Sequence, residues 1–236
     1  MGSYAEPGWA AETGWPAVSG ALTELALSAE PGSDTQLAAV QALASGKLQP
    51  EQLALIEGWR SGSALLGGLT VDTDLSWTLL AALVAHGVLG PADIDAAAAA
   101  DPTASGQRRA TQVRALIPDP ASKAAVWDRL IGDDGMANAL QSAAVAGFSH
   151  PAHAELLAPF TARYFAEVGG VWDSRSVEVG KRIAVGLYPR WAVDQSTVDA
   201  ALAWDAAEHP SALRRLVSEG RAGTERALRA RRADAG

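Results

Sequence analysis

The sequence contains no cysteine among its 236 residues. Disulfide frameworks and thiolate metal sites are therefore excluded, and the composition fits a reducing compartment, so we expect a cytoplasmic protein. No apolar run reaches the ~20 residues that a membrane-spanning helix needs. The N-terminus also lacks the basic start and apolar core of a signal peptide. We therefore expect no membrane partner.

Positive charge is also scarce, because 19 lysines and arginines stand against 27 aspartates and glutamates, for a net charge of −8. This balance disfavours a nucleic-acid partner. Residues 214–236 are the exception, with seven arginines and three acidic residues. Two interpretations stay open for this segment. It is either a basic contact surface for an acidic partner, or a solvated last helix whose cations complement its dipole.

Histidine is rare too, and two of the four histidines lie three residues apart, His150 and His153, with Glu155 behind them. A zinc peptidase helix needs His-Glu-x-x-His, because that spacing puts both imidazoles on one face. Pro151 favours the first turn of a helix, which places His150 at the N-cap or just outside it. Glu155 suits the positive end of the helix dipole. We predict a helix start here and no metal site.

The remaining polar candidates have structural interpretations. His86 lies on the last turn of an apolar helix, where it would cap a carbonyl, and His209 precedes a proline at a helix junction. Asp72 and Asp74 resemble a carboxylate pair, but helix capping explains both, with Asp74 as the expected N-cap. The sequence has no Gly-x-Ser-x-Gly elbow, P-loop or dinucleotide fingerprint. We therefore predict no catalytic residue in this chain.

What the sequence does have is alanine and leucine at helical spacing, with short breakers every ~10 to 18 residues. This pattern predicts an all-α fold. Short turns between helices of unequal length indicate an α-solenoid-like superhelix of stacked antiparallel helix pairs, similar to HEAT or armadillo arrays. Residues 1–20 are expected to be an irregular N-terminal segment or a truncation remnant, and residues 21–236 a single all-α domain. Helices are expected over 151–168, 173–187, 195–207 and 210–232, after a helical hairpin that turns at 132–135.

Several stretches follow one another in an order that resembles the C-terminal helical domain of actinobacterial aminopeptidase N, of the gluzincin-type zinc aminopeptidase family. They include GLTVDTDLSWTLLAALVAHG, NALQSAAVAGFSHPAHAELLAPFTARYFAEV and VWDSRSVEVGKRIAVGLYP. In that family the zinc ligands, the general-base glutamate and the Gly-x-Met-x-Asn motif belong to an upstream domain. None of these motifs occurs here.

The resemblance implies a non-catalytic domain that closes over the upstream catalytic domain of the same polypeptide, walls off a chamber and limits entry to peptide substrates. Zinc is then expected upstream, and this chain alone is expected to be inactive. The resemblance also implies a basic substrate contact, for which Arg182 is the candidate; a solvated or interdomain cation is the alternative. A stand-alone α-helical repeat scaffold that binds a protein or peptide stays open as an alternative function.

Overall fold

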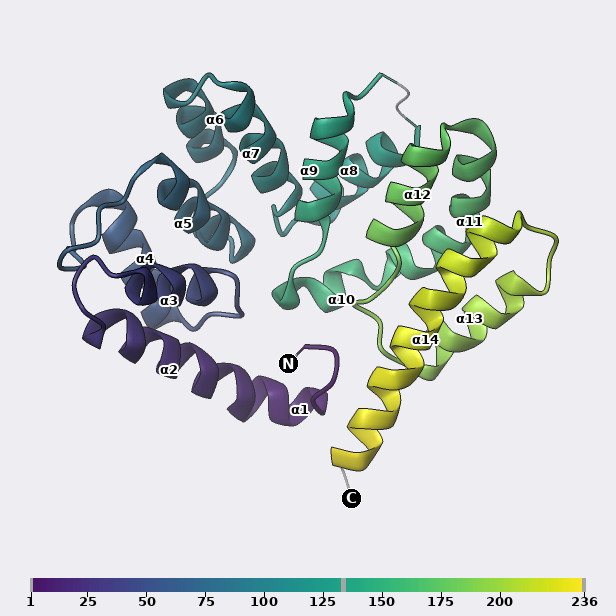
Figure 1. The fold of residues 1–236 in the computed structure, drawn as a ribbon, viewed down its shortest axis with the longest axis horizontal. Coiled ribbons are helices and arrows are strands. Elements are labelled where there is room, and N and C mark those ends of the chain that lie inside the picture. The colour runs from purple at the N-terminus through teal and green to yellow at the C-terminus, as the bar shows by residue number, and fades with distance from the viewer. Residues whose placement is uncertain (1, 133–134, 235–236) are drawn as a thin grey trace. The chain divides into compact units, whose positions relative to one another are not determined.

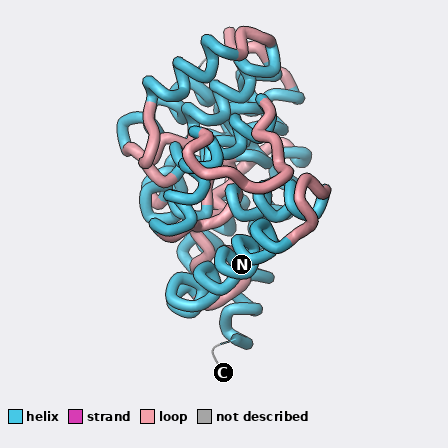
Figure 2. Tube along the Cα trace, turned by 90° about the vertical axis from the view of Figure 1, so that its left-hand side faces the viewer, coloured by secondary structure: helices cyan, strands magenta, loops and turns pink. Residues whose placement is uncertain are grey.

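The structure is a computed structural model that describes residues 2–132 and 135–234, and over these ranges it contains helices and loops but no strand (Figure 2). The predicted all-α class is confirmed. The chain divides into two compact units, Gly8–Pro118 and Met1–Pro7 with Asp119–Gly236, which we call the N-terminal and C-terminal units. The superhelical arrangement of the whole chain stays a prediction. No helix in the described residues is long and apolar enough to cross a membrane.

The helices keep the order shown in Figure 1. In the first half of the chain they are α1 (Pro7–Trp9), a π-helical turn (Ala10–Gly14), α2 (Trp15–Ser28), α3 (Asp34–Ala44), α4 (Pro50–Ser61), α5 (Thr73–Ala85), α6 (Pro91–Ala100) and α7 (Ala104–Ala115). In the second half they are α8 (Pro120–Gly132), α9 (Asn138–Phe148), a 3-10 turn (Pro151–His153), α10 (Ala154–Leu157), α11 (Pro159–Ser174), α12 (Val177–Gly186), α13 (Gln195–Asp205) and α14 (Ser211–Asp234).

Helix α5 is the centre of the N-terminal unit, where it packs against α3, α4 and α7. Leu79 and Leu83 are fully buried on its α3–α4 side, while Leu80 and Val84 are fully buried on its α7 side. A helix that is apolar all round is stable in water only when neighbours cover it on every side. The pairs α2–α3 and α6–α7 complete that cover.

The irregular segment expected over residues 1–20 is helical from Pro7 onward. Pro16 has no N–H to continue the α-helical ladder, and the chain adapts with a π-helical turn in which the N–H of Trp15 donates to the carbonyl of Ala10. One wider turn thus accommodates Gly14 and Pro16 within a helical segment.

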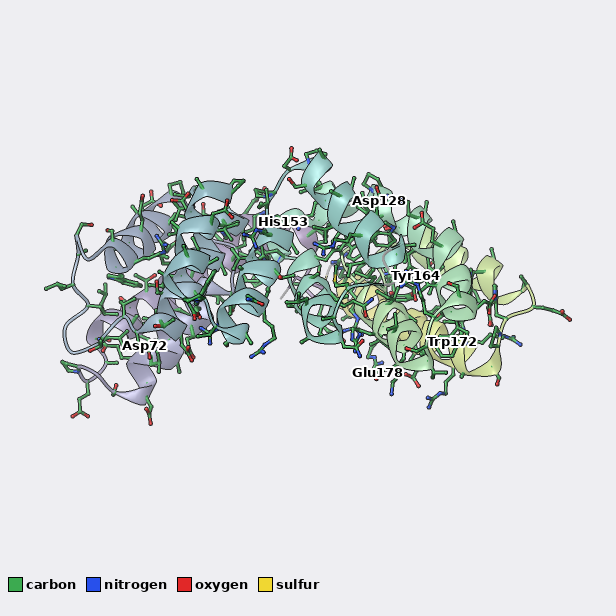
Figure 3. All side chains as sticks on the ribbon, turned by 90° about the horizontal axis from the view of Figure 1, so that it is seen from above. Asp72, Asp128, His153, Tyr164, Trp172 and Glu178 are labelled. Carbon is green, nitrogen blue, oxygen red and sulfur yellow. The ribbon has the colours of Figure 1, made fainter. Side chains whose placement is uncertain are left out.

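Aromatic side chains fill the core of the C-terminal unit. The rings of Trp127, Phe148 and Phe160 lie within 5.1–5.4 Å of one another, and the Phe148–Phe160 pair meets edge to face. Tyr164 lies in the same core and donates its hydroxyl hydrogen to the carbonyl of Ala184 at 2.7 Å (Figure 3). Such contacts stabilise aromatic pairs beyond their buried area. They tie α8, α9, α11 and α12 into one body.

Two helix boundaries differ from the sequence expectation. The helix expected over 151–168 is divided at Ala158, because Pro159 has no N–H to donate to Glu155 and α11 starts afresh there and runs to Ser174. The next helix starts only at Val177, where the Ser176 hydroxyl accepts the N–H of Val179. The hairpin of α8 and α9 is present, but residues 133–134 of its turn lie outside the described residues.

Candidate functional site

The histidine pair starts a helix, as the sequence predicted. His150 is the N-cap of the 3-10 turn, and its Nδ1 accepts the N–H of Ala152 at 3.2 Å. His153 is buried, with its ring 5.2 Å from the ring of His150, and Glu155 lies in the first turn of α10. In the described part of the chain, no group of three or more histidines and acidic residues could hold a metal ion. His150, His153 and Glu155 therefore do not form a zinc site. The family resemblance implies that zinc is bound by the upstream domain.

The other two histidines hold helix ends in place. His86 Nδ1 lies 2.8 Å from the carbonyl of Ala82, as a capping role predicts, and His86 Nε2 accepts the N–H of Leu48 at 3.1 Å. Burial lowers the pKa of His86, which keeps its ring neutral and able to accept that bond. His209 stacks on Trp204 with ring centroids 3.7 Å apart.

The aspartate pair is divided between two roles. Asp72, not the expected Asp74, is the N-cap of α5, and its Oδ1 accepts the N–H of Leu75 at 2.8 Å. Asp74 is the second residue of the helix, where it forms a 2.8 Å ion pair with Arg109 of α7. The prediction that capping explains the pair is correct for Asp72 only. A sequence cannot show which of two aspartates has the extended backbone of an N-cap.

Arg182, the candidate substrate contact, lies on α12 and faces α9. Its Nη1 donates to Asn138 Oδ1 at 3.2 Å and to Gln141 Oε1, and its Nη2 donates to Glu178 Oε1 at 2.9 Å. The side chain is 16% exposed. The guanidinium thus joins two helices and keeps part of its donor capacity, because arginine has five N–H donors and these bonds use three.

The arginine-rich helix α14 satisfies several of its cations internally. Arg214 pairs with Asp205 at 2.9 Å, and Arg221 lies 3.9 Å from Glu225. Arg231 donates to the carbonyls of Val193 and Gly2, which fastens the N-terminal segment to the C-terminal unit. Of these three arginines, Arg214 and Arg231 bind groups outside α14 and only Arg221 faces an acidic residue of its own helix, so both interpretations of this segment stay open.

Two polar features escaped the sequence reading. Lys123 is 0% exposed, and its Nζ donates to the carbonyl of Phe148 at 2.7 Å. Burial lowers its pKa to about 7. Arg60 extends into a pocket between α4, α5 and α6. Neither residue belongs to a motif, and an isolated cation at a helix position gives no signal of burial in the sequence.

Comparison with known proteins identifies the family of the chain. Residues 11–226 match the family model of the ERAP1-like C-terminal domain. The chain belongs to that family. As an ERAP1-like C-terminal domain it is also 45% identical, over 232 residues, to a protein of Streptomyces lividans named Aminopeptidase N. The alignment covers 96% of this chain and 27% of the relative.

Membership of the ERAP1-like C-terminal domain family confirms the resemblance identified from the sequence. The family match starts at residue 11, so it includes part of the segment over residues 1–20 that was expected to be irregular. Since the chain spans about a quarter of the relative's length, the activity of a whole aminopeptidase is a matter for proposal.

Proposed function

We propose that this chain is the non-catalytic C-terminal domain of a zinc-dependent aminopeptidase. In this role it caps the active-site chamber and gates peptide access for the removal of N-terminal amino acids. The observation that carries the proposal is the alignment, which covers nearly all of this chain but only 27% of a protein named Aminopeptidase N. The partner is the upstream catalytic domain of the same polypeptide, which holds the zinc, and the substrates are peptides in the cytoplasm.

Exposed apolar side chains support a surface that another domain covers. Val18 and Leu25 of α2 are 38% and 42% exposed, and their spacing of seven residues puts them on one face of the helix. Leu65, in the loop after α4, is 89% exposed. Contiguous exposed apolar surface marks interaction sites, and Val18 and Leu25 share one helix face that a single partner surface can cover. In the proposed enzyme, contact with the upstream domain removes part of this surface from water.

The proposed mechanism is gating rather than chemistry. Opening and closing of two domains admits substrate, excludes water during the reaction and sets the rate of product release in many enzymes. The C-terminal unit, whose core is filled with aromatic side chains, is suited to form part of one wall of such a chamber. The size limit on substrates then comes from the closed chamber, while bond cleavage comes from the upstream domain.

Within this proposal Arg182 contacts the peptide through the N–H donors that Asn138, Gln141 and Glu178 leave unused. An arginine fork matches a carboxylate in geometry and charge. In the full-length enzyme, Arg182→Ala should lower kcat/KM for short peptides about 10-fold. Lys181→Ala, at the exposed neighbouring position, is the matched control. An unchanged kcat/KM in Arg182→Ala, with an unchanged Tm, would refute the contact.

The gating role is tested by comparing the full-length protein with a version that ends before this chain. Hydrolysis of an aminoacyl anilide shows that the shortened protein is active, and zinc analysis shows that it holds its metal. We expect the shortened protein to remove N-terminal residues from a folded protein that the full-length enzyme leaves intact. An identical size preference in the two proteins would contradict the proposal.

A further inference from the structure

The loop that joins α4 to α5 directs one leucine into water. Leu65 is 89% exposed, while its two neighbours in sequence face inward. Ala64 is partly buried against the core of the N-terminal unit, and Leu66 is 7% exposed within that core. Residues 62–71 carry no charged side chain, so the loop around Leu65 is apolar or neutral throughout.

Backbone hydrogen bonds hold the loop on both sides of Leu65. On one side the N–H of Ala64 donates to the carbonyl of Gly58 in α4 at 3.0 Å, and on the other side the N–H of Leu69 donates to the carbonyl of Leu66 at 3.0 Å. A Cβ on Gly58 would lie 2.9 Å from the Cβ of Ala64, so the loop also packs closely against α4. The folded chain thus fixes by itself the conformation that presents Leu65.

A buried glutamine ties this loop to the end of α2. Gln36 of α3 is 2% exposed, and its Nε2 donates to the carbonyl of Gly67 at 3.3 Å and to the carbonyl of Ala26 at 3.1 Å. Its Oε1 accepts the N–H of Gly32 at 2.8 Å. Breaking any of these bonds would leave an unsatisfied polar atom in the interior, which is unfavourable. The loop after α4 and the turn after α2 are therefore held as one surface.

A second exposed leucine lies on the segment that Gln36 holds. Leu27 directly follows Ala26 in α2 and is 56% exposed. Apolar side chains gain free energy when they leave water, and the gain grows with the area that is buried. A preformed loop loses little conformational entropy on docking, so that gain stabilises the contact. Leu65 and Leu27 therefore mark a surface that suits a partner with an apolar cavity.

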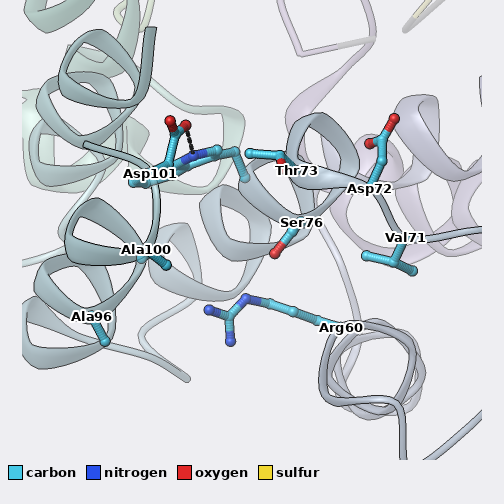
Figure 4. A pocket seen from close by; sticks show the side chains of 10 residues that line it. Arg60, Val71, Asp72, Thr73, Ser76, Ala96, Ala100 and Asp101 are labelled. Carbon is cyan, nitrogen blue, oxygen red and sulfur yellow. Dashed lines mark hydrogen bonds between the residues drawn. The ribbon is translucent and has the colours of Figure 1, made fainter. Parts of the chain in front are cut away.

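Three pockets in the described residues do not suit the Leu65 side chain of a second copy. The pocket of about 420 Å³ between α4, α5 and α6 contains the Arg60 guanidinium and the Ser76 hydroxyl (Figure 4). Two pockets in the C-terminal unit are likewise lined by charged side chains, among them Arg226 and Asp205. A leucine that entered any of these pockets would remove water from charged groups without replacing its hydrogen bonds.

The rest of a longer polypeptide is the partner that the comparison supports. The alignment covers 27% of the relative, so most of the length of that protein lies outside the match. A covalently linked domain also meets Leu65 at a high effective concentration. We propose that Leu65 anchors this domain in an apolar pocket of the upstream domain. The inference rests on the proposed function and adds to it the residue that carries the contact.

Hydroxyl-radical footprinting tests the contact, because it labels individual leucine side chains according to their exposure to water. The full-length protein is compared with this chain alone. In the chain alone, Leu65 should be labelled faster than Leu202 of α13, since the two side chains are 89% and 45% exposed. In the full-length protein we expect Leu65 to lose most of its labelling, and Leu27 to be protected with it.

The other results overturn the inference in distinguishable ways. Full labelling of Leu65 in the full-length protein, with protection elsewhere in this chain, would refute Leu65 as the anchor and leave the proposed function intact. Absence of protection anywhere in this chain would contradict the proposed function as well. Protection of Leu65 in the chain alone that grows with protein concentration would identify a second copy as the partner.

Variants of the full-length protein then separate an anchor from a bystander. Leu65→Asp puts a carboxylate where an apolar pocket is proposed, and an unpaired charge enters such a pocket only with a large loss of hydration. Leu27 should then be labelled as fast as in the chain alone. Leu65→Met should retain the protection of Leu27. Leu202→Asp, at an exposed position of the C-terminal unit, is the matched control and should retain it too.

The fold of the variant is checked on the chain alone. Because Leu65 is exposed there, Leu65→Asp should leave the Tm of the chain unchanged. With the fold intact, wild-type protection of Leu27 in full-length Leu65→Asp would overturn the inference.

Discussion

The buried lysine makes the stability of the C-terminal unit depend on pH in a specific way. Lys123 is fully buried against the carbonyl of Phe148, and its pKa is lowered from 10.5 to about 7 because burial disfavours the charged form. Between these two values the unfolded chain holds the proton and the folded chain releases it. Raising the pH through this range therefore favours folding, and below pH ~6 the contribution is constant because both states are protonated.

The expected magnitude follows from the shift. One pH unit corresponds to about 1.36 kcal/mol when one proton separates the two states, so the free energy of unfolding should rise by about 2 kcal/mol between pH 7 and pH 9. Lys123→Met removes this titration. The variant also leaves the carbonyl of Phe148 without that donor, which costs about 1–3 kcal/mol at every pH. The difference in free energy of unfolding between the wild type and Lys123→Met is then plotted against pH. Its slope reports the titration of Lys123, and its pH-independent part reports the lost hydrogen bond.

The assay is urea unfolding of the wild type, Lys123→Met and Lys181→Met at several pH values from 6 to 9. Lys181 is exposed on α12, so its replacement should leave the pH dependence of the wild type unchanged. Burial lowers the pKa of His86, and because His86 is unchanged in all three proteins its contribution cancels in the comparison. The reasoning is refuted if the wild type and Lys123→Met show parallel pH dependences between pH 7 and pH 9.

Two further matched pairs test the local packing. Gly106→Ala should destabilise the chain by roughly 1–3 kcal/mol, because an added Cβ would overlap the carbonyl oxygen of Asp101. Gly20→Ala, in the helix α2 with no atom within 4 Å of such a Cβ, should stabilise it by about 0.5–1 kcal/mol; thermal unfolding that shifts both variants in the same direction would contradict this. Asp72→Ala should cost about 1 kcal/mol as a lost N-cap, and Asp74→Ala less, because it removes only an exposed ion pair. Equal losses in urea unfolding would show that Asp72 is no cap.

The helices could be predicted from the sequence because their signals are local. Pro50 and Pro91 stand at first turns, Ser33 accepts the N–H of Gln36 as an N-cap, and Gly87 follows the end of α5 with a positive φ of 71°. Each of these residues fixes a backbone conformation without help from distant parts of the chain.

The burial of Lys123 and of the Nε of Arg60 could not be predicted, because it depends on distant contacts. Lys123 reads as a surface lysine until α9 places the carbonyl of Phe148 against it, 25 residues away in sequence. Arg60 likewise looks solvated until α5 and α6 enclose its Nε. The family, by contrast, could be predicted from several sequence stretches that follow one another in the order of the family. No single residue of the site carries that information.

The central claim is that this chain is one domain of a longer aminopeptidase. The most direct measurement is the size of the native gene product, detected with an antibody against this chain in extract of the source organism. The account predicts a band several times heavier than the 24.3 kDa of the chain, since the alignment covers 27% of the relative. A band near 24.3 kDa would contradict the account and favour a free-standing helical scaffold.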